Sequence, residues 1–345
     1  MTLQIWRQLA LNAPRAGAAP QATGTLRATP EDFVVEEDLG FAPDGAGSHL
    51  LLKVRKRNAN TGWVAQELAR ALGCHVRDVG FAGLKDRRAV AIQWFSLPAT
   101  PRSMAEAAGL ENPEFAVLEV HSHRRKLPRG ALAGNRFTIR IRNYTGADSQ
   151  LQARCESMAR DGVPNYFGPQ RFGREAGNLS RLAMPRPGRP DGFVLSAARS
   201  LIFNAALGER VRQGSWAGLE PGDVANLDGR GSVFPVTDVT PELTERLAQQ
   251  DLHPTGPMWG VGELMSRGAV LELEQRIGAQ LVEACALLSD AGLRQERRSL
   301  RLKVRDLTWQ WGADGVQLGF WLRSGSFATA VLRELLGDEV DADDA

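Results

Sequence analysis

The chain has 345 residues, of which 43% are hydrophobic and 24% charged, and this ordinary composition excludes a disordered, collagenous or fibrous protein. No apolar run approaches the ~20 residues of a membrane-spanning helix, and the first twenty residues lack the apolar segment of a secretory signal. The net charge of +2 conceals a basic body, because five acids stand among the last ten residues. Three widely spaced cysteines predict reduced thiols in the cytoplasm, and neither they nor the five histidines have the spacing of metal ligands.

The first expected elements are an arm, a strand and a helix. Residues 1–24 are rich in alanine, glycine and proline, which predicts a flexible arm. A strand is expected over residues 51–54. Residues 61–72 predict a helix, since their apolar residues share one face, Thr61 can cap the start and Gly73 can follow the end.

The middle of the chain changes character. Short strands are expected at 79–81 and 90–94, and the clearest strand covers 135–141, where apolar and arginine-rich positions alternate. After Gly162, turn clusters surround one obvious helix near 196–212.

The last part returns to strands. Alternation reappears at 302–304 and 316–322, and a final helix is expected over 326–336. Strands at both ends around a loop-rich middle predict an α+β fold with an antiparallel or mixed sheet, interrupted by an inserted domain. The expected parts are a first segment at 1–161, an insertion at 162–298, and a C-terminal segment at 299–345 that ends in an acidic tail at 338–345.

Residues 80–89, GFAGLKDRRA, form the first segment that could carry chemistry. Two glycines after a strand indicate a sharp turn. Asp86 lies among Lys85, Arg87 and Arg88, whose charges would keep it ionised, as a nucleophile or a base requires. A turn aspartate in a solvated charge cluster is the competing interpretation. The spacing of a phosphate-binding P-loop is missing.

Basic residues cluster in three runs, at 53–57, 121–129 and 294–305. Each run alone can be a solvated face, but the three on one domain would form an extended surface for a polyanion such as RNA. In the second run, the residues expected to contact RNA are Arg124, Arg125, Lys126 and Arg129.

Aromatic residues stand beside polar ones in two further places. Asn135 and Phe137 continue the apolar face of the clearest strand, so Phe137 is either its first core residue or an aromatic plate for a base. In residues 163–173, rings interleave with Arg171, a pattern typical of an RNA-binding loop or of a packed loop at a domain junction. Residues 324–329 are expected to start the last helix. Their free N–H groups would favour an anion, and plain helix capping is the competing interpretation.

Five segments together resemble the bacterial tRNA pseudouridine synthase D family, TruD. They are FAGLKDRRAV at 81–90, HRRKLPRGALAGNRF at 123–137, VPNYFGPQRFG at 163–173, LSAARSLIFN at 195–204 and WLRSGSFATAVLREL at 321–335. The likeness covers about residues 25–336. It implies that uridine is isomerised to pseudouridine at position thirteen of tRNA, in the cytoplasm, without cofactor or metal. It also implies a pseudouridine-synthase catalytic domain interrupted by a family-specific α/β domain.

The resemblance also implies roles for single residues. Asp86 matches the catalytic aspartate, which either attacks C1′ or takes a proton from C2′ after the uridine is flipped out of its stack. Arg27 stands just ahead of PEDFVV, where the family usually has lysine, and guanidinium differs from ammonium in reach and geometry. The residues expected to hold the substrate are Phe137, Asn135, Phe327, Arg27 and Lys85.

Two other classes of function fit parts of the pattern. A non-catalytic RNA-binding protein would use the same basic surfaces but would need no lone carboxylate beside a glycine turn. Release of tritium from 5-tritiated uridine in tRNA separates these two. An aspartate-dependent phosphatase or hydrolase would show more acids near Asp86, where only Asp78 is close, and activity insensitive to EDTA would dismiss it.

Overall fold

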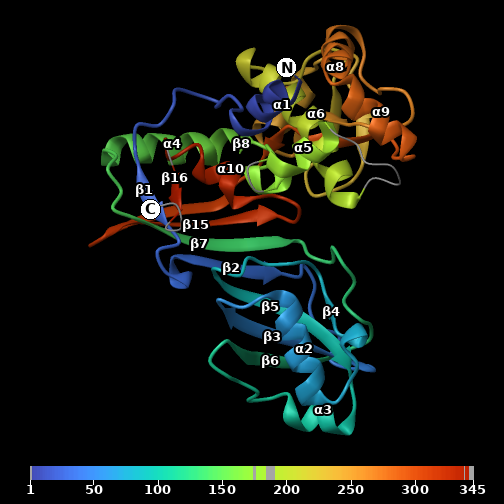
Figure 1. Cartoon of the computed structure of the whole chain (residues 1–345). Coiled ribbons are helices and arrows are strands. Elements are labelled where there is room, and N and C mark those ends of the chain that lie inside the picture. Colours follow the sequence, from blue (N-terminus) through green and yellow to red (C-terminus); the bar gives the residue numbers. More distant parts are fainter. Residues whose placement is uncertain (1, 174–175, 184–190, 338, 342–345) are drawn as a thin grey trace. The chain divides into compact units, whose positions relative to one another are not determined.

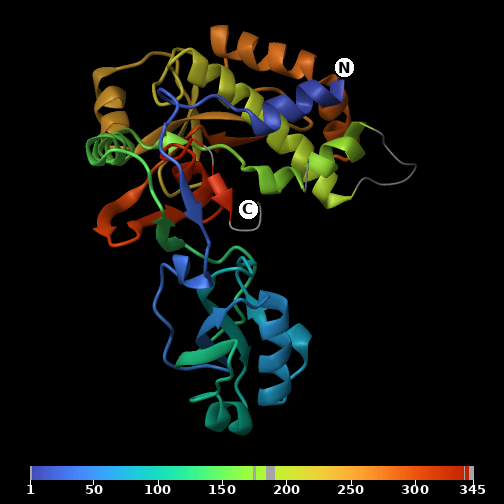
Figure 2. The same cartoon turned by 60° about the vertical axis from the view of Figure 1, so that its left-hand side comes forward.

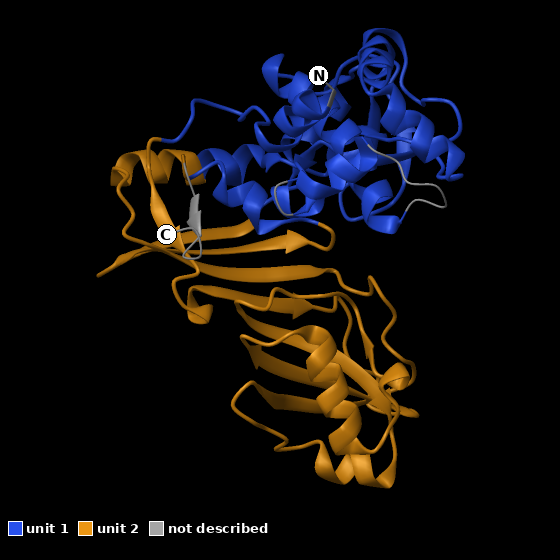
Figure 3. Cartoon of the chain, in the orientation of Figure 1, with its two compact units in different colours: residues 1–20, 156–304, 326–335 blue, residues 21–155, 305–325, 336–345 orange. Residues whose placement is uncertain are grey.

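The computed structural model describes residues 2–173, 176–183, 191–337 and 339–341 (Figures 1 and 2). The chain divides into two compact units, each built from separate stretches of sequence (Figure 3). Unit 1 comprises residues 1–20, 156–304 and 326–335, and unit 2 comprises residues 21–155, 305–325 and 336–345. This division differs from the expected one mainly at 1–20 and 326–335, which we expected to belong with the segments of unit 2.

Within the described residues, unit 2 is a ten-stranded sheet with helices α2 (Thr61–Leu72) and α3 (Pro101–Glu106). Its strands are β1 (Gly24–Leu26), β2 (Phe33–Asp38), β3 (His49–Arg57), β4 (Gly80–Phe81), β5 (Val90–Pro98), β6 (Phe115–His123), β7 (Gly134–Arg142), β14 (Arg305–Gly312), β15 (Gly315–Arg323) and β16 (Glu339–Asp341). The main path runs β14-β15-β7-β2-β5-β3-β6. Pairs β2–β5 and β1–β16 are parallel and the others antiparallel. The predicted mixed sheet is confirmed.

Strand β7 is the strand predicted over 135–141, and it lies between β2 and β15. Its register with β15 sets Phe137 opposite Phe320 and Ile139 opposite Leu318. Side chains alternate along a strand, so these apolar residues share the buried face while Arg136 points to the other face. Phe320, Ile139 and Leu318 are 0% exposed, and Phe137 is 7% exposed.

Helix α2 covers one face of β3 and β5. The N-cap of the helix is Asn60 and not, as predicted, Thr61, which is the first helical residue. The helix is followed by Gly73, whose φ of 67° is the left-handed conformation that glycine adopts easily. The predicted helix over 61–72 is otherwise confirmed. Its inward residues pack in one core with residues of β3 and β5, among them Val64, Leu68, Leu72, Leu50, Leu52, Val54, Phe95 and Leu97. Strand β5, which directly follows the 82–89 loop, and its neighbour β3 are therefore fixed to a helix.

Within its described residues, unit 1 combines the sheet β10-β9-β11-β12 and the pair β8–β13 with helices around α6 (Gly192–Arg212). Its strands are β8 (Val163–Pro164), β9 (Val224–Leu227), β10 (Val233–Pro235), β11 (Leu252–Met258), β12 (Glu296–Ser299) and β13 (Arg301–Leu302). Its other helices are α1 (Thr2–Leu11), α5 (Gly177–Ala183), α7 (Pro241–Ala248), α8 (Gly268–Gln280), α9 (Val282–Asp290) and α10 (Ala328–Leu332). Helix α4 (Asp148–Asp161) spans the division between the units. The expected helix near 196–212 is confirmed, but the part of the chain described as turn clusters around it also contains α5, α7, α8 and α9.

Helix α1 replaces the first part of the flexible arm expected at 1–24. Trp6 is 1% exposed and Ala10 4% exposed, and both belong to the core that surrounds α6. Leu3, Trp6 and Ala10 recur at helical spacing. The alanine- and glycine-rich residues that follow obscured this signal, so that part of the expectation was wrong.

No helix in the described ranges combines the length and the apolar character needed to cross a membrane. Part of the predicted acidic tail, residues 338 and 342–345, lies outside the described residues.

Candidate active site

Asp86 lies in the loop of residues 82–89 between β4 and β5, called here the Asp86 loop. Its side chain is 65% exposed, and its Oδ2 is 3.5 Å from Nη2 of Arg27. The guanidinium of Arg27 also lies 4.4 Å from the ring centre of Phe33 on β2. The structure thus brings together two of the predicted site residues that are 59 positions apart in the chain.

Lys56 forms a hydrogen bond with the main chain of Asp86. Its Nζ donates hydrogen bonds of 2.8 Å to the backbone carbonyl oxygens of Asp86 and Ala59, and the residue is 0% exposed. Burial lowers the pKa of Lys56 from 10.5 to about 8, and the nearby charge of Asp86 opposes this shift. Lys56 therefore anchors Asp86 and adds positive charge beside it, a role that we did not predict.

The ammonium group of Lys85 points into the protein, where it pairs with a buried carboxylate. Its Nζ lies 2.5 Å from Oε1 of Glu37, whose side chain is 0% exposed. Glu37 also accepts hydrogen bonds from the backbone N–H of Trp94, at 2.8 Å, and from Nε2 of Gln93, at 3.3 Å. Burial raises the pKa of Glu37, while the Lys85 ammonium and these N–H groups lower it. The charge of Lys85, which we expected to lie beside Asp86, is therefore paired with Glu37.

The Asp86 loop is hydrogen-bonded to buried side chains on both sides of Leu84. Gln93 Nε2 donates to the carbonyl oxygen of Gly83 at 2.6 Å, and the N–H of Lys85 donates to Oγ1 of Thr61 at 3.1 Å. Thr61 in turn donates to Oε1 of Gln93 at 3.0 Å. Helix α2 and strands β3 and β5 together fix the backbone that presents Asp86.

Asn135 and Phe137 lie on β7 at the buried face of the sheet. Asn135 is 9% exposed, and among the described residues its Oδ1 has no hydrogen-bond partner. Phe137 packs edge-on against Phe33 at 6.1 Å between ring centres and stacks on Phe320 at 5.3 Å. Of the two interpretations of Phe137, this packing favours a core residue, linked to Arg27 through Phe33.

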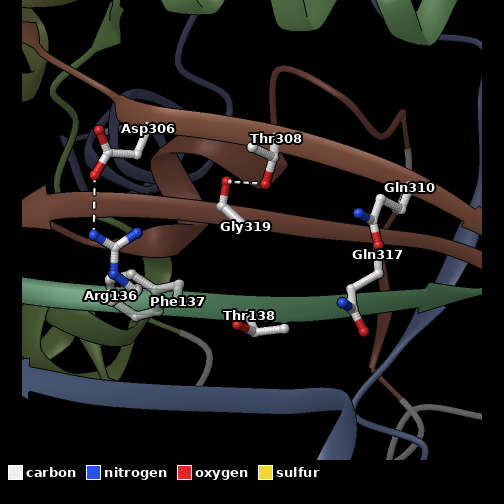
Figure 4. Close-up of a pocket in the computed structure, with 8 residues that line it drawn as sticks. All are labelled: Arg136, Phe137, Thr138, Asp306, Thr308, Gln310, Gln317 and Gly319. Carbon is white, nitrogen blue, oxygen red and sulfur yellow. Dashed lines mark hydrogen bonds and ion pairs between the residues drawn. The ribbon is translucent and has the colours of Figure 1, made fainter.

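A polar groove lies on the opposite face of the same sheet (Figure 4). Arg136 and Asp306 form an ion pair of 3.0 Å at one end of it, and the other residues that line it are Phe137, Thr138, Thr308, Gln310, Gln317 and Gly319. Because side chains alternate along β7, the side chain of Arg136 points away from the face that carries Asn135 and Phe137. The groove is therefore separate from the residues gathered around Asp86.

Members of two of the three basic runs form ion pairs with carboxylates of the protein itself. In the first run, Lys53 pairs with Glu36 at 2.9 Å and Arg57 with Glu31 at 2.5 Å. In the third, Arg297 pairs with the buried Glu274 at 2.8 Å. Residues 294–304 also belong to unit 1, so the expectation that all three runs share one domain was wrong.

The second run, at 121–129, presents exposed arginines. Arg124, Arg125 and Arg129 are exposed, and in the described part of the chain no carboxylate lies within 4.0 Å of their guanidinium groups. The guanidinium carbon of Arg129 lies 3.8 Å from the ring centre of Phe81. Lys126 instead donates to the backbone carbonyl oxygen of Arg77. The exposed guanidinium groups of Arg124, Arg125 and Arg129 are accessible to phosphate groups.

Phe327 and Arg171 form a cluster within unit 1. The guanidinium of Arg171 lies 5.1 Å from the ring centre of Phe167 and 5.5 Å from that of Phe327, and it donates to Oγ of Ser196 at 2.9 Å. Burial lowers the pKa of Arg171. Phe327 therefore belongs to a different unit from Asp86. It precedes α10, a helix of five residues that is shorter than the one predicted over 326–336.

Comparison with known proteins bears on the whole chain. Residues 16–182 and 191–335 match the model of the family described as tRNA pseudouridine synthase D (TruD). The chain is 43% identical over 327 residues to the tRNA pseudouridine synthase D of Aeromonas hydrophila, with 93% of each chain covered. It is 44% identical over 353 residues to that of Xanthomonas axonopodis pv. citri, with 95% of each covered.

A solved structure agrees in fold. A Methanosarcina mazei protein, whose crystal structure carries the provisional name tRNA pseudouridine synthase D (TruD), superposes with a TM-score of 0.75 at 23% identity. The match covers 97% of this chain and 98% of that one. The family match and the curated relatives extend over nearly all of the sequence, so the chain belongs to the tRNA pseudouridine synthase D family.

Proposed function

We propose that this chain isomerises uridine to pseudouridine in tRNA, at position thirteen, with Asp86 as the catalytic carboxylate. The observation that carries the proposal is an exposed carboxylate on a fixed loop. Asp86 is 65% exposed, while Lys56 holds its backbone carbonyl at 2.8 Å. A carboxylate that must meet a ribose carbon needs both accessibility and a defined position.

The chemistry needs few groups. If Asp86 attacks C1′, an Asp86–C1′ bond forms as the C1′–N1 bond breaks, and it breaks again when C5 of the turned uracil bonds to C1′. If Asp86 instead takes the C2′ proton, the C1′–N1 bond breaks to leave a glycal, and the proton returns to C2′ as C5 bonds to C1′. In either route C5 then releases its proton and N1 gains one. Atoms and electrons balance within the nucleotide, so the proposed reaction consumes no second substrate. Arg27, 3.5 Å from Asp86, is placed to hold the carboxylate and a neighbouring phosphate.

The remaining proposed roles follow from position. Asn135 offers a buried Oδ1 that, among the described residues, lacks a hydrogen-bond partner, and a ribose hydroxyl could supply one. Arg124, Arg125 and Arg129 supply phosphate contacts, and we propose that Arg171 and Phe327 contact the RNA from unit 1. We also propose the cytoplasm as the compartment, because tRNA is the substrate and Cys74 and Cys285 are free thiols.

The decisive variant is Asp86→Asn, which keeps the shape of the side chain and removes its charge. Tritium release from 5-tritiated uridine in tRNA should fall to background, while filter binding should give a Kd within about twofold of wild type, because phosphate contacts dominate affinity. Asp78→Asn, a change at an exposed acid of the same unit, is the control and should keep full turnover. Substantial turnover by Asp86→Asn would show that another residue does the chemistry, and mapping of pseudouridine in the product tests position thirteen.

A further inference from the structure

Leu84 is an apolar side chain that the structure holds in solvent beside Asp86. It is 74% exposed and lies two residues before Asp86, so the two Cα atoms are at most about 7 Å apart. Single exposed leucines are common and need no explanation by themselves. The surroundings of Leu84 are what distinguish it.

The backbone around Leu84 cannot withdraw the side chain without breaking buried hydrogen bonds. Gly83 is held by Gln93 at 2.6 Å, Lys85 by Thr61 at 3.1 Å, and Asp86 by Lys56 at 2.8 Å. Gln93, Thr61 and Lys56 are all buried. Leu84 is therefore presented by a fixed loop, at a fixed separation from the carboxylate.

Free cations lie next to this loop. The N–H of Gly130 donates to the carbonyl oxygen of Ala82 at 2.7 Å, which places the end of the 121–129 run against the start of the Asp86 loop. Arg129, the last residue of that run, is exposed and lies over Phe81, the final residue of β4. An apolar side chain flanked by arginines suits a nucleic acid, which offers phosphates outside and an apolar base stack inside.

We propose that Leu84 enters the RNA base stack at the place that the target uridine leaves, and holds this gap open while Asp86 acts. The inference rests on the proposed function. A uridine must leave its stack before C1′ can be reached, and apolar side chains inserted between bases are a known way to stabilise an opened step. A Cα–Cα separation of at most about 7 Å is no longer than two base steps of about 3.4 Å each, so Leu84 and Asp86 can serve neighbouring positions.

The test compares two RNAs and three variants. One RNA is an intact tRNA transcript, and the other carries an abasic site opposite the target uridine, which is then already loosened. Leu84→Ala should lower kcat/KM on the intact tRNA by roughly ten- to a hundredfold, the range expected when opening one base step loses its support. On the abasic RNA the same variant should lose less than about threefold. Leu84→Met, which keeps a long apolar side chain, should stay near wild type on both RNAs.

Leu118→Ala is the matched control, because Leu118 on β6 is a leucine that is also exposed, by 46%, and lies outside the Asp86 loop. It should leave both rates unchanged. A second readout uses 2-aminopurine beside the target uridine, bound to Asp86→Asn protein so that no turnover intervenes. Its fluorescence should rise on binding, and the double variant with Leu84→Ala should lose most of this rise.

Equal losses on both RNAs would overturn the proposal, since Leu84 would then act through the loop and not through the stack. Unchanged rates and fluorescence would overturn it as well. If wild-type protein forms no pseudouridine in either RNA, the proposed function fails instead, and the fluorescence comparison still decides whether Leu84 enters the stack.

Discussion

Replacing Lys56 with methionine tests whether the buried ammonium serves the Asp86 loop at the expense of stability. A pKa lowered from 10.5 to about 8 means that the charge of Lys56 costs the folded state about 3 kcal/mol at neutral pH. Methionine removes this cost but also the hydrogen bonds to Asp86 and Ala59, worth about 1.5–3 kcal/mol each with a charged donor. We expect Lys56→Met to lose between about 0 and 3 kcal/mol of unfolding free energy, and to lose most of its turnover because Asp86 is no longer anchored.

The pH dependence of stability isolates the ammonium. Between about pH 8 and 10.5 the unfolded chain keeps the Lys56 proton while the folded chain releases it, so the unfolded state binds more protons and the unfolding free energy rises with pH. Urea unfolding at pH 7.5 and 9.5 should show this rise in wild type relative to Lys56→Met, since tyrosines and cysteines contribute equally to both. The matched control is Lys53→Met, whose lysine lies on the same strand and has its pKa raised by Glu36. Parallel pH profiles for wild type and Lys56→Met would refute the reasoning.

Two further predictions concern the core and the RNA surface. Phe137→Ala should lower the unfolding free energy by about 3–5 kcal/mol, because the ring is 7% exposed and packs between Phe33 and Phe320. Urea unfolding measures this loss. A loss below about 1 kcal/mol would mean that the ring is not a core residue and would favour its stacking on uracil. Changing Arg124, Arg125 and Arg129 together to glutamine should weaken binding of all tRNAs alike and reduce the slope of log K against log salt by about one unit per lost contact. The control triple, made at arginines that form exposed ion pairs, changes Arg57, Arg102 and Arg160. Similar slopes for the two triples would mean that the 121–129 run is only a solvated face.

Elements with strong periodicity could be predicted from the sequence. The helix at 61–72 and the strand at 135–141 each repeat one pattern over several turns or pairs, and burial of that pattern decides the local structure. Helix α1 (Thr2–Leu11) has only four inward positions, Leu3, Trp6, Leu9 and Ala10, before the alanine- and glycine-rich stretch. Its stability comes from packing on the α6 core, which local pattern does not reveal.

Prediction of the site from the sequence was limited in the same way. Asp86 was singled out by its basic neighbours and then by a resemblance of motifs, which also indicated Arg27, whereas Glu37 and Lys56 were missed. A signal was present, because Glu37 continues the inward series of Phe33 and Val35, and Lys56 continues that of Leu52 and Val54. A charge at an inward position predicts a buried partner. Which partner it meets depends on loops brought together only in the folded chain.

The pairing of β7 with β15 also has a consequence for biosynthesis. Nine registered pairs join residues 134–142 to residues 315–323, so about 180 residues must be translated after β7 before its partner exists. At 5–20 residues per second, the edge of β7 waits on the order of ten to forty seconds on the ribosome. During that time Ile139 and Ile141, which are 0% exposed in the folded protein, have no Leu318 or Val316 to cover them. An unpaired apolar edge is a template for aggregation, so we expect nascent chains of this protein to depend on holding chaperones until the last strands emerge.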